Sequence, residues 1–433
     1  MTEPLRVALL GCGVVGSQVA RLLTTQTDDM EARVGRPIEL IGIAVRDAGK
    51  PRPGLPRSLF TTDAPALVAQ QPDVVIELIG GVEPADTLIR DAIDRGTSVV
   101  TANKALLAVR GGELFDAADQ HGVDLYFEAA VAGAIPIVRP LRESLVGDEI
   151  TTVMGIVNGT TNFILDKMTT DSMTFTDALT LAQAAGYAEA DPSADTEGFD
   201  AANKAAILAR LAFHAPVTAD QVYREGITDV TPEDIQAAAS ANCVLKLLAV
   251  CQVLPDGAVS VRVHPAMVPL EHPLAGVHSA YNAIFVHARQ AGRLMFLGPG
   301  AGGVPTASAV IGDFVTVARN RHLGIAGPGH VVDVARPMAA TGEAMTRYHL
   351  RFRVVDTPGV LATVAAIFAN HQVSLATVRQ TRPVALDDKS PFAAELNLTT
   401  HLALEADQQA CVADLMASPV VGGAPRVLRM EGM

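Results

Sequence analysis

The sequence predicts an α/β protein built on a doubly wound parallel sheet, followed by an α+β region and a C-terminal unit of ferredoxin-like topology. A Gly-x-Gly-x-x-Gly pattern at residues 11–16 stands between a strand-like run and a helix-like run. Strand-like and helix-like segments then alternate as far as residue 131, which is typical of a parallel sheet with helices on both faces. From about residue 347 the order becomes βαββαβ, the ferredoxin-like unit.

The first segment of the chain favours a dinucleotide-binding turn. Residues 5–10 form an apolar run typical of a buried strand, and apolar residues recur at helical spacing after the glycines. In such a turn the first glycine permits the tight bend, the second lets a pyrophosphate approach, and the third allows close helix packing. The free N–H groups of the helix then face the anion. The predicted cofactor contacts here are Gly11, Gly13, Val14, Val15 and Gly16. A tight turn without a ligand is the alternative.

The rest of the first third continues the alternation. We expect strands at 37–45, 73–80, 98–103 and 123–131, and helices at 63–71, 83–96 and 104–121, the last interrupted around Gly111 and Gly112. Ligands of parallel sheets bind beyond the carboxyl ends of the strands. The strand ends at Val45, Gly80 and Asn103 should therefore line one crevice with the glycine loop, and Ala44 and Gly80 are predicted cofactor contacts there.

The end of the second strand bears on the choice of cofactor. An acidic residue there binds the ribose 2′-hydroxyl of NAD, whereas an arginine accommodates the 2′-phosphate of NADP. Arg46 comes first in this chain, Asp47 follows it, and Lys50 is close behind. Arg46 favours NADP, and Asp47 leaves NAD open.

Composition narrows the classes of function. The chain has 433 residues and a net charge of −14, with no basic run, which argues against a nucleic-acid partner. No apolar stretch is long enough to span a membrane, and the first strand leaves no room for a signal peptide. The four cysteines form no Cys-x-x-Cys pair, which fits a reducing cytoplasm. We expect a cytoplasmic protein without membrane partners.

The remaining chain divides into a middle region, a linker and the C-terminal unit. The middle region should contain strands at 149–159, 243–254, 259–268 and 282–289, with helices at 174–188 and around Lys204 on one side of the sheet. A second glycine-rich helix start lies at 298–303. We expect a nucleotide-binding domain at 1–136 completed by 301–325, a substrate-binding and dimerisation domain at 137–300, a linker at 326–346 and a regulatory domain at 347–433.

Two segments carry residues suited to chemistry. Lys104 follows a strand end, beside the expected nicotinamide position. A loop rich in carboxylates, at residues 189–200, leads into a helix in which Asp200 and Lys204 are four residues apart and share one face. A surface ion pair is the alternative for these two residues. The chain has few lysines, however, and Lys204 lies in a mostly apolar helix.

These segments resemble the homoserine dehydrogenase family, of the monofunctional kind with a C-terminal ACT domain. The resemblance runs along nearly the whole chain and is carried by "LLGCGVVG", "VTANKALLA", "YFEAAVAGAIPI", "GIVNGTTNFIL", "AGYAEADPSADTEGFDAANK", "NAIFV" and "GPGAGGVPTASAVIGD". It implies interconversion of L-aspartate 4-semialdehyde and L-homoserine with NADP or NAD, on the route to threonine, methionine and isoleucine.

The resemblance also implies roles for single residues. Lys204 would donate the proton in aldehyde reduction, and Lys104 would bind substrate and cofactor and polarise the carbonyl. A fixed cation that can give up a proton stabilises the negative charge that hydride delivery creates on the oxygen. The substrate-binding residues would be Glu189, Asp200, Gly186 and Asp195, and Gly302 would approach the cofactor.

A cation and an effector follow from the same resemblance. A structural sodium ion would be held by Glu128 with the backbone carbonyls of Val131, Gly133 and Ile135. An ACT domain implies an amino-acid effector, for which L-threonine is the candidate. We expect L-threonine to bind at Asp356 and at the helix start at Gly359. We expect a homodimer or homotetramer.

Three other readings are weaker. A hydroxy-acid dehydrogenase with an ACT domain would use a histidine–carboxylate pair, which the sequence does not present. A Schiff-base mechanism at Lys204 would be trapped by borohydride. A cofactor-dependent amino-acid sensor without catalysis would need neither Lys104 nor Lys204.

Overall fold

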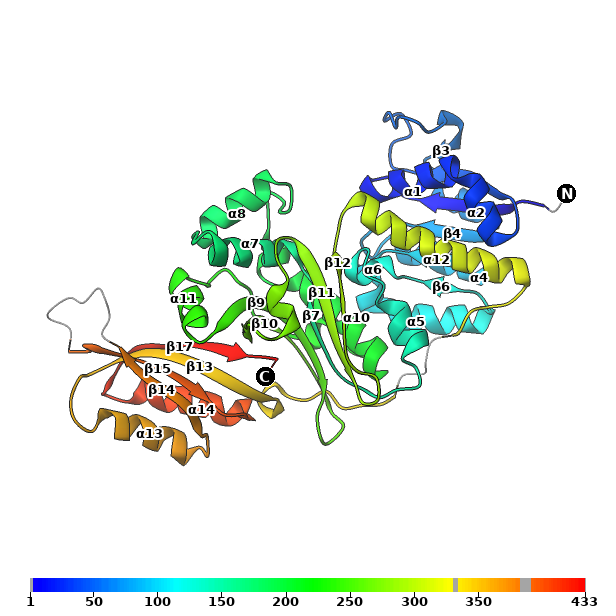
Figure 1. The fold of residues 1–433 in the computed structure, drawn as a ribbon. Helices are drawn as coiled ribbons and strands as arrows, with labels where there is room; N and C mark the ends of the chain where they lie inside the picture. The colour runs from blue at the N-terminus through cyan, green and yellow to red at the C-terminus, as the bar shows by residue number, and fades with distance from the viewer. Residues whose placement is uncertain (1–2, 330–333, 382–390, 433) are drawn as a thin grey trace.

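The computed structural model describes residues 3–329, 334–381 and 391–432. Figure 1 shows three parts in a row: a layered α/β part with the N-terminus, a central part, and a smaller part with one layer of helices on a sheet. Within the described residues, no helix combines the length and the apolar character that crossing a bilayer requires.

The first part is a six-stranded parallel sheet in the order β3-β2-β1-β4-β5-β6. This is the predicted doubly wound sheet, and the fold class is confirmed. The strands are β1 (Leu5–Leu10), β2 (Ile38–Ala44), β3 (Phe60–Thr61), β4 (Val74–Glu77), β5 (Ser98–Thr101) and β6 (Leu125–Tyr126). Most of their side chains are buried because both faces of the sheet are covered.

Two groups of helices cover this sheet (Figure 1). One core joins the sheet to α1 (Val14–Thr25), α2 (Thr27–Val34) and α12 (Gly303–Leu323). The other face carries α3 (Ala64–Val68), α4 (Ala85–Asp94) and α5 (Lys104–His121). Helix α12 comes from far along the chain and packs its buried residues Val310, Phe314 and Val317 into the first core.

The predicted strand at 123–131 is wrong in its second half. Strand β6 ends at Tyr126, and Ala129–Ala132 form the short helix α6. Three alanines favour a helix. The Glu128 carboxylate also accepts the backbone N–H groups of residues 137–139, so the chain folds back on itself here instead of continuing as a strand.

The expected interruption at Gly111 and Gly112 is also wrong, because α5 is continuous from Lys104 to His121. A β-carbon at position 112 would lie only 2.2 Å from the Arg210 guanidinium. Gly112 therefore gives a side chain of a neighbouring helix room to pack against α5.

The central part contains a mainly antiparallel sheet with helices packed against it. Its strands are β7 (Ile150–Ile156), β8 (Tyr223–Arg224), β9 (Cys243–Val253), β10 (Val259–Pro269), β11 (Tyr281–Ala288) and β12 (Gly292–Pro299). Strand β8 pairs in parallel with β10, and the other strand pairs within this part are antiparallel. The helices are α7 (Gly159–Thr170), α8 (Phe175–Ala184), α9 (Ser193–Thr196), α10 (Phe199–Phe213) and α11 (Pro232–Ser240). Buried residues along α10 pack on the sheet and also face α5, so this helix joins the first two parts.

The third part has the predicted βαββαβ order. Its elements are β13 (Met345–Val354), α13 (Val360–Asn370), β14 (Leu375–Thr381), β15 (Ala394–Thr400), β16 (Ala403–Leu404), α14 (Glu405–Ala417) and β17 (Val421–Met430). The sheet order β17-β13-β15-β14 is continuous with the central sheet, because β17 pairs in parallel with β10 through residues 429–430 and 266–267. The sequence did not predict this shared sheet.

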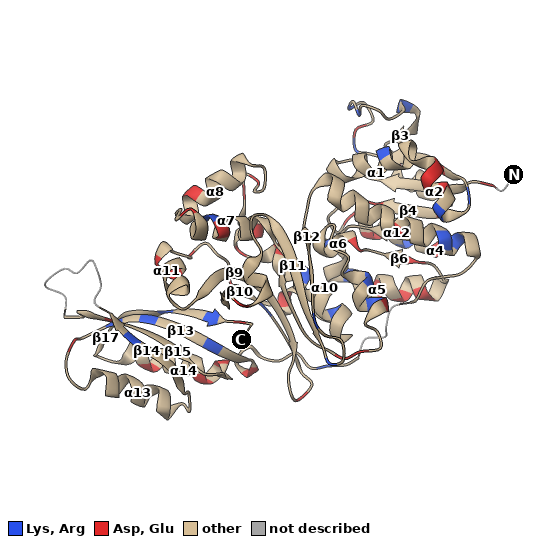
Figure 2. Ribbon diagram, in the orientation of Figure 1, with Lys and Arg blue, Asp and Glu red and all other residues tan. Residues whose placement is uncertain are grey.

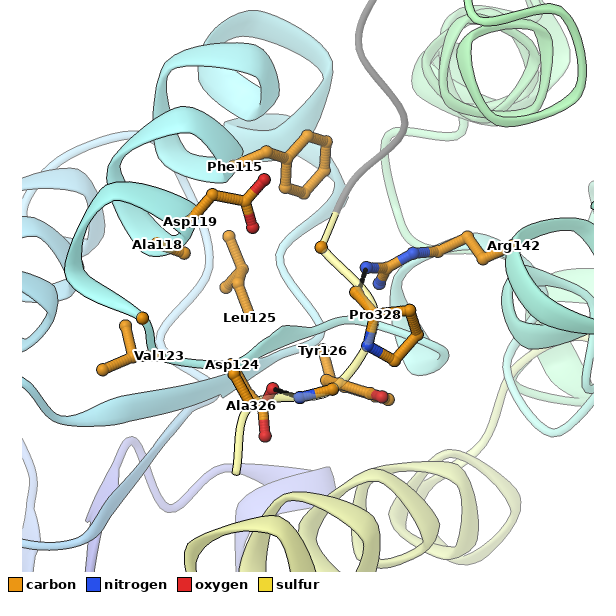
Figure 3. A pocket seen from close by; sticks show the side chains of 13 residues that line it. Phe115, Ala118, Asp119, Val123, Asp124, Leu125, Tyr126, Arg142, Ala326 and Pro328 are labelled. Carbon is orange, nitrogen blue, oxygen red and sulfur yellow. Dashed lines mark hydrogen bonds between the residues drawn. The ribbon is translucent and has the colours of Figure 1, made fainter. Parts of the chain in front are cut away.

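The segment that follows α12 is fixed to the first part. The Gly327 N–H donates to Asp124 over 2.7 Å, and Arg142 donates to the Pro328 carbonyl over 3.1 Å. Figure 3 shows the pocket of about 270 Å³ beneath this segment, lined by α5, β6 and Arg142. None of the predicted catalytic or cofactor residues lines it.

Candidate active site

The Asp200 carboxylate lies between the two predicted catalytic lysines. Lys204 Nζ donates to Asp200 Oδ2 over 2.8 Å, and Lys104 Nζ pairs with Asp200 Oδ1. Asp200 and Lys204 are only 8% and 7% exposed, so their pair is internal and not a surface ion pair. The Lys104 side chain is 43% exposed. The structure thus brings Lys104 to the Asp200–Lys204 pair, although Lys104 and Asp200 are 96 positions apart in the sequence.

An asparagine extends this cluster toward the carboxylate loop. Asn158 Nδ2 donates to Asp195 Oδ1 over 2.6 Å and lies 3.0 Å from Asp200 Oδ2. Lys204 Nζ makes a further bond of 2.7 Å to the Val157 carbonyl. Asn158 therefore connects Asp195, which the sequence predicts to bind substrate, with Asp200.

Helix starts position these side chains. Asn103 caps α5 by accepting the Leu106 N–H at 3.2 Å, which fixes Lys104 at the first helical position. Asn158 caps α7 in the same way through the Thr161 N–H at 2.9 Å. Asp200 lies in the first turn of α10 and Lys204 one turn later. Each residue of the cluster is therefore held by a rigid element.

Burial and charge set the protonation behaviour of the cluster. Burial alone would raise the pKa of Asp200, but the charges of Lys204 and Lys104 outweigh it and hold this pKa well below its usual range. Burial lowers the pKa of Lys204, Asp200 opposes this change, and the charge of Lys104 adds to the lowering. The site therefore combines a fixed carboxylate with a buried ammonium that loses its proton more readily than a free lysine.

The glycine loop has the geometry that a dinucleotide requires. A β-carbon at Gly11 would meet the Leu78 carbonyl at 2.5 Å, and one at Gly16 would meet the Gly11 carbonyl at 2.2 Å. At Gly13, the residue before α1, a β-carbon would meet nothing within 4 Å, and no side chain caps this helix. The start of α1 is therefore open to an anion.

A second helix start meets the first. Gly302 precedes α12 with φ of +119°, and a β-carbon at Gly303 would lie 2.9 Å from Val14. Val14 and Val304 are exposed apolar residues at the starts of α1 and α12, while Val15 is half-buried and packs against the core of the parallel sheet. Exposed apolar residues around open helix termini suit a cofactor that has both rings and phosphates.

The ends of β2 and β4 meet this loop: the Gly11 N–H donates to the Ala44 carbonyl over 2.9 Å, and the Leu78 N–H donates to the Leu10 carbonyl over 2.7 Å. Gly80 and Asn103 lie beside it at the ends of β4 and β5, where Asn103 donates to the Gly81 carbonyl over 2.6 Å. Arg46 and Lys50 are exposed on the loop after β2. Sequence reasoning missed Arg52, whose Nη1 donates to the Asp47 carbonyl over 3.0 Å while its Nε approaches the Cys12 carbonyl.

Two predicted substrate residues lie on an exposed loop. Gly186 has φ of +76° with open space around it. Glu189 is exposed, and within the described residues no hydrogen bond or ion pair links its side chain to the Asp200 cluster. Thr160 anchors this loop by donating to the Tyr187 carbonyl over 2.7 Å, two residues after Asn158. The contact of Glu189 with substrate stays a prediction.

The residues predicted to hold sodium form one short buried segment, but their carboxylate has another partner. Glu128 accepts the N–H groups of Ile137, Val138 and Arg139 at 2.6–3.0 Å. Val131, Gly133 and Ile135 follow on and after α6, and Gly133 packs against Gly300. Among the described residues no group of His, Cys, Asp and Glu is arranged to hold a metal. The geometry assigns Glu128 to backbone capping, and the sodium site stays a prediction.

The predicted effector residues lie together at the turn between β13 and α13. Gly359 precedes α13 with φ of +92°, and no side chain caps this helix start. Asp356 is exposed and accepts a bond of 3.2 Å from Gln380 on β14. An effector role for these residues stays a prediction.

Asn158 and Arg52 are the site residues that sequence reasoning did not single out. Asn158 had a local signal, since an asparagine between a strand and a helix is a typical N-cap. The signal identifies a cap, however, and not a bridge between Asp195 and Asp200. Arg52 follows a proline in an irregular loop and had no signal.

The fold and site together define a nicotinamide-dinucleotide-dependent oxidoreductase with a C-terminal ferredoxin-like unit. Family models for "Homoserine dehydrogenase, NAD binding domain" and "Homoserine dehydrogenase" match residues 11–128 and 136–315. The ACT domain model matches residues 348–386. The chain belongs to the homoserine dehydrogenase family, as the sequence predicted.

Homoserine dehydrogenases from other organisms match this chain over nearly its whole length. Homoserine dehydrogenases from Corynebacterium glutamicum and Mycobacterium tuberculosis are each 52% identical, over 98% and 99% of this chain and 95% and 98% of theirs. The crystal structure of a homoserine dehydrogenase from Thiobacillus denitrificans has 38% identity and a TM-score of 0.90, covering 99% of this chain and 98% of its own. A hyperthermophilic archaeal homoserine dehydrogenase in complex with NADPH has 26% identity and a TM-score of 0.63, covering 76% and 100%.

Replacing Glu128 should test its capping role. Glu128→Ala leaves three backbone donors without their acceptor, and each buried unpaired donor costs about 1–3 kcal/mol. We expect the free energy of unfolding, measured with urea in sodium-free potassium buffer, to fall by at least that amount. The free energy of unfolding should fall less in Glu128→Gln, because glutamine keeps one acceptor oxygen. Equal stability of Glu128→Ala and wild type in this buffer would contradict the capping role.

Proposed function

We propose that this chain interconverts L-aspartate 4-semialdehyde and L-homoserine with a nicotinamide cofactor, using Lys204 as the proton donor. The observation that carries the proposal is the buried Asp200 carboxylate paired with both Lys104 and Lys204. The family membership of the chain supports the same substrates. The direct test is loss of nicotinamide absorbance when purified protein, NADPH and aspartate 4-semialdehyde are mixed.

Reduction of the aldehyde needs a cation and a proton at the carbonyl oxygen. A bound dinucleotide supplies the hydride. Lys204 stabilises the developing negative charge and transfers its proton to the oxygen, and its lowered pKa makes this transfer easier. Lys104, more exposed and at the start of α5, adds a second positive charge toward the carbonyl. Oxidation of homoserine reverses these steps, so Lys204 must then be neutral.

The carboxylates suit the amino-acid end of the substrate. Asp200 uses both oxygens on the lysines, so it chiefly orients them, and Asp195 and Glu189 remain for the substrate ammonium. Asp195 is half-buried and held by Asn158, whereas Glu189 lies on the exposed loop that also carries Gly186. We assign Asp195 as the fixed contact and Glu189 as one that forms when substrate binds.

The loop after β2 supports NADP as the preferred cofactor. Arg46 and Lys50 are exposed there, and Arg52 holds the loop backbone against the glycine turn. Together they form a positive region where the 2′-phosphate of a bound cofactor would lie. The solved relative in complex with NADPH agrees with this preference, and Asp47 leaves NAD open.

Further parts of the proposal rest on the resemblance. The ACT domain would bind L-threonine as an inhibitor near Asp356 and Gly359, which calorimetry with L-threonine on the full-length protein tests. The central sheet would form the dimer. A structural sodium ion would lie beside Glu128 and takes no part in the chemical steps. The domain limits given above and a cytoplasmic location stay expectations.

Removing the proton donor should abolish the chemical step. Lys204→Met keeps the apolar stem of the side chain and should still bind NADPH, but turnover should fall by about 10² to 10⁴-fold. Steady-state turnover and NADPH binding by fluorescence check this. Lys167→Met, which alters a partly exposed lysine paired with Asp171, is the matched control. Near-normal turnover of Lys204→Met would place the donor elsewhere.

The pH dependence should follow the pKa of Lys204. Homoserine oxidation needs neutral Lys204, so its turnover should rise with pH and reach a plateau. Because burial lowers this pKa, the rise should be complete below the range of a free lysine, whose pKa is about 10.4. The charge of Lys104 contributes to the lowering, so Lys104→Gln should move the rise to higher pH. A profile of turnover against pH with saturating homoserine measures both effects. A shift of the rise to lower pH in Lys104→Gln would contradict the assignment of this pKa to Lys204.

Arg46 should distinguish the two cofactors. Only NADPH offers a 2′-phosphate for a charge-assisted hydrogen bond, which is worth roughly 1.5–3 kcal/mol, or about tenfold to a hundredfold in affinity. Arg46→Ala should weaken NADPH by this factor and leave NADH nearly unchanged, as dissociation constants from fluorescence titration would show. Equal losses for both cofactors would mean that Arg46 shapes the loop without contacting the phosphate.

A further inference from the structure

The ACT domain meets the central part at a buried arginine. The Arg429 side chain on β17 is 7% exposed and lies 2.6 Å from the Glu405 carboxylate of its own domain. On its other side it lies 2.7 Å from Glu225 Oε1 and 3.2 Å from the Tyr223 hydroxyl, both of the central part. Tyr348 and Thr346 also donate to Glu405, at 2.7 and 2.6 Å. Arg429 therefore joins a fixed acidic group of the ACT domain to Glu225.

The segment that carries Glu225 is packed on the loop between α9 and α10. The Ile227 N–H donates to the Thr196 carbonyl over 2.7 Å. A β-carbon at Gly226 would lie 2.5 Å from that carbonyl oxygen and 2.6 Å from Glu197 Cα, so the two backbones are in close contact. The Arg224 guanidinium also lies over the Phe199 ring at 3.5 Å.

Residues 195–200, which we call the substrate loop, run from the end of α9 into the first turn of α10 and carry Asp195, the proposed substrate contact, and Asp200, which pairs with the lysines. Residue 195, bonded to Asn158, precedes the contact with Ile227 by one position, and Asp200 follows Phe199 by one. A displacement of Glu225 would therefore move the backbone between Asp195 and Asp200. The contacts run without a gap from Arg429 to the groups that pair with Lys204.

A second ion-pair group fastens the ACT domain elsewhere. Arg426 and Arg351 both pair with Asp234 on α11, at 2.7 and 3.3 Å. Within the described part of the chain, no hydrogen bond, ion pair or ring contact links these three residues to the loop at 195–200. Figure 2 marks the basic residues along the strands of this domain. Arg426 also donates to the Asp229 carbonyl over 3.0 Å, two residues after Ile227, so it touches the segment that carries Glu225, whereas Arg351 pairs with Asp234 on α11. Arg351 is therefore the better reference for a contact between the same domains that lies off this path.

We propose that Glu225, held by Arg429, is a positioning residue that sets the substrate loop and carries changes in the ACT domain to substrate affinity. This inference deepens the proposed function, on which its kinetic part rests. Coupling of this kind requires contacts that both sites share, and substitutions along such contacts typically change it by 0.5–2 kcal/mol. The position of Glu225 predicts an effect on substrate binding and little effect on the chemical step.

Glu225→Gln in the full-length protein tests the proposal. Glutamine keeps the size of the side chain and its hydrogen bond with Tyr223 but removes the charge that pairs with Arg429. We expect the KM for homoserine to rise roughly two- to thirtyfold, with turnover at saturation nearly unchanged and amide hydrogen exchange at residues 195–200 faster. The matched control is Arg351→Gln, which removes an ion pair between the same domains and should leave both readouts at the wild-type level.

The outcomes separate the alternatives. Unchanged KM and exchange in Glu225→Gln would overturn the proposal, and so would an equal effect of Arg351→Gln, which would indicate general loosening of the ACT domain. If wild-type protein does not oxidise homoserine, the proposed function fails, and the exchange comparison alone decides the positioning role. If Glu225→Gln does not fold, Gly226→Ala gives the second test. It crowds the Thr196 carbonyl with the ion pair intact, and an unchanged homoserine KM in that variant would overturn the proposal.

Discussion

Two ammonium groups from different parts of the chain share the Asp200 carboxylate, and the arrangement of the first two domains depends on this contact. Lys104 opens α5 beside the parallel sheet, and Lys204 lies one turn into α10 of the central part. Burying charges is favourable only when they are paired and hydrogen-bonded. Lys204 alone balances the buried Asp200 charge, and the contact of the more exposed Lys104 with the same carboxylate brings the start of α5 against α10. Gly112 permits that approach because a side chain there would collide with Arg210.

A second buried ionic contact holds the return of α12 to the first domain. Arg139 donates to Asp313 over 2.7 Å, and Asp313 also accepts the Glu128 N–H at 2.7 Å. Burial raises the pKa of Asp313 to about 6, although Arg139 opposes this rise. The Glu128 carboxylate then caps residues 137–139, where the chain leaves for the central part. Helix α12 and the exit of the chain to the central part are thus fixed by one connected group of charges.

The ACT domain is part of the same structure rather than an appended module. Its β17 extends the central sheet through β10, and Arg429, Arg426 and Arg351 bring positive charge to carboxylates of the central part. Removal of one partner from such a buried pair is strongly destabilising, because the other charge is left uncompensated. Deleting the whole domain would therefore remove β17 from the sheet and leave Asp234 without its arginines. Single substitutions are for this reason the sharper way to separate regulation from assembly.

The sequence by itself determined the glycine loop, the doubly wound sheet, the βαββαβ unit and the pairing of Asp200 with Lys204, because each depends on local periodicity, turn residues or four-residue helix spacing. The resemblance added the family and a predicted role for Lys104. Only the tertiary structure decided that Lys104 meets Asp200, that Asn158 bridges Asp195 to Asp200, that Glu128 caps a distant backbone and that β17 continues the central sheet. These contacts join residues with no periodic relation along the chain, so no pattern within a single segment specifies them. The helix at 129–132 and the unbroken α5 were missed for the same reason. The conformation of the alanines and glycines in these segments depends on packing against distant residues as well as on local helix propensity.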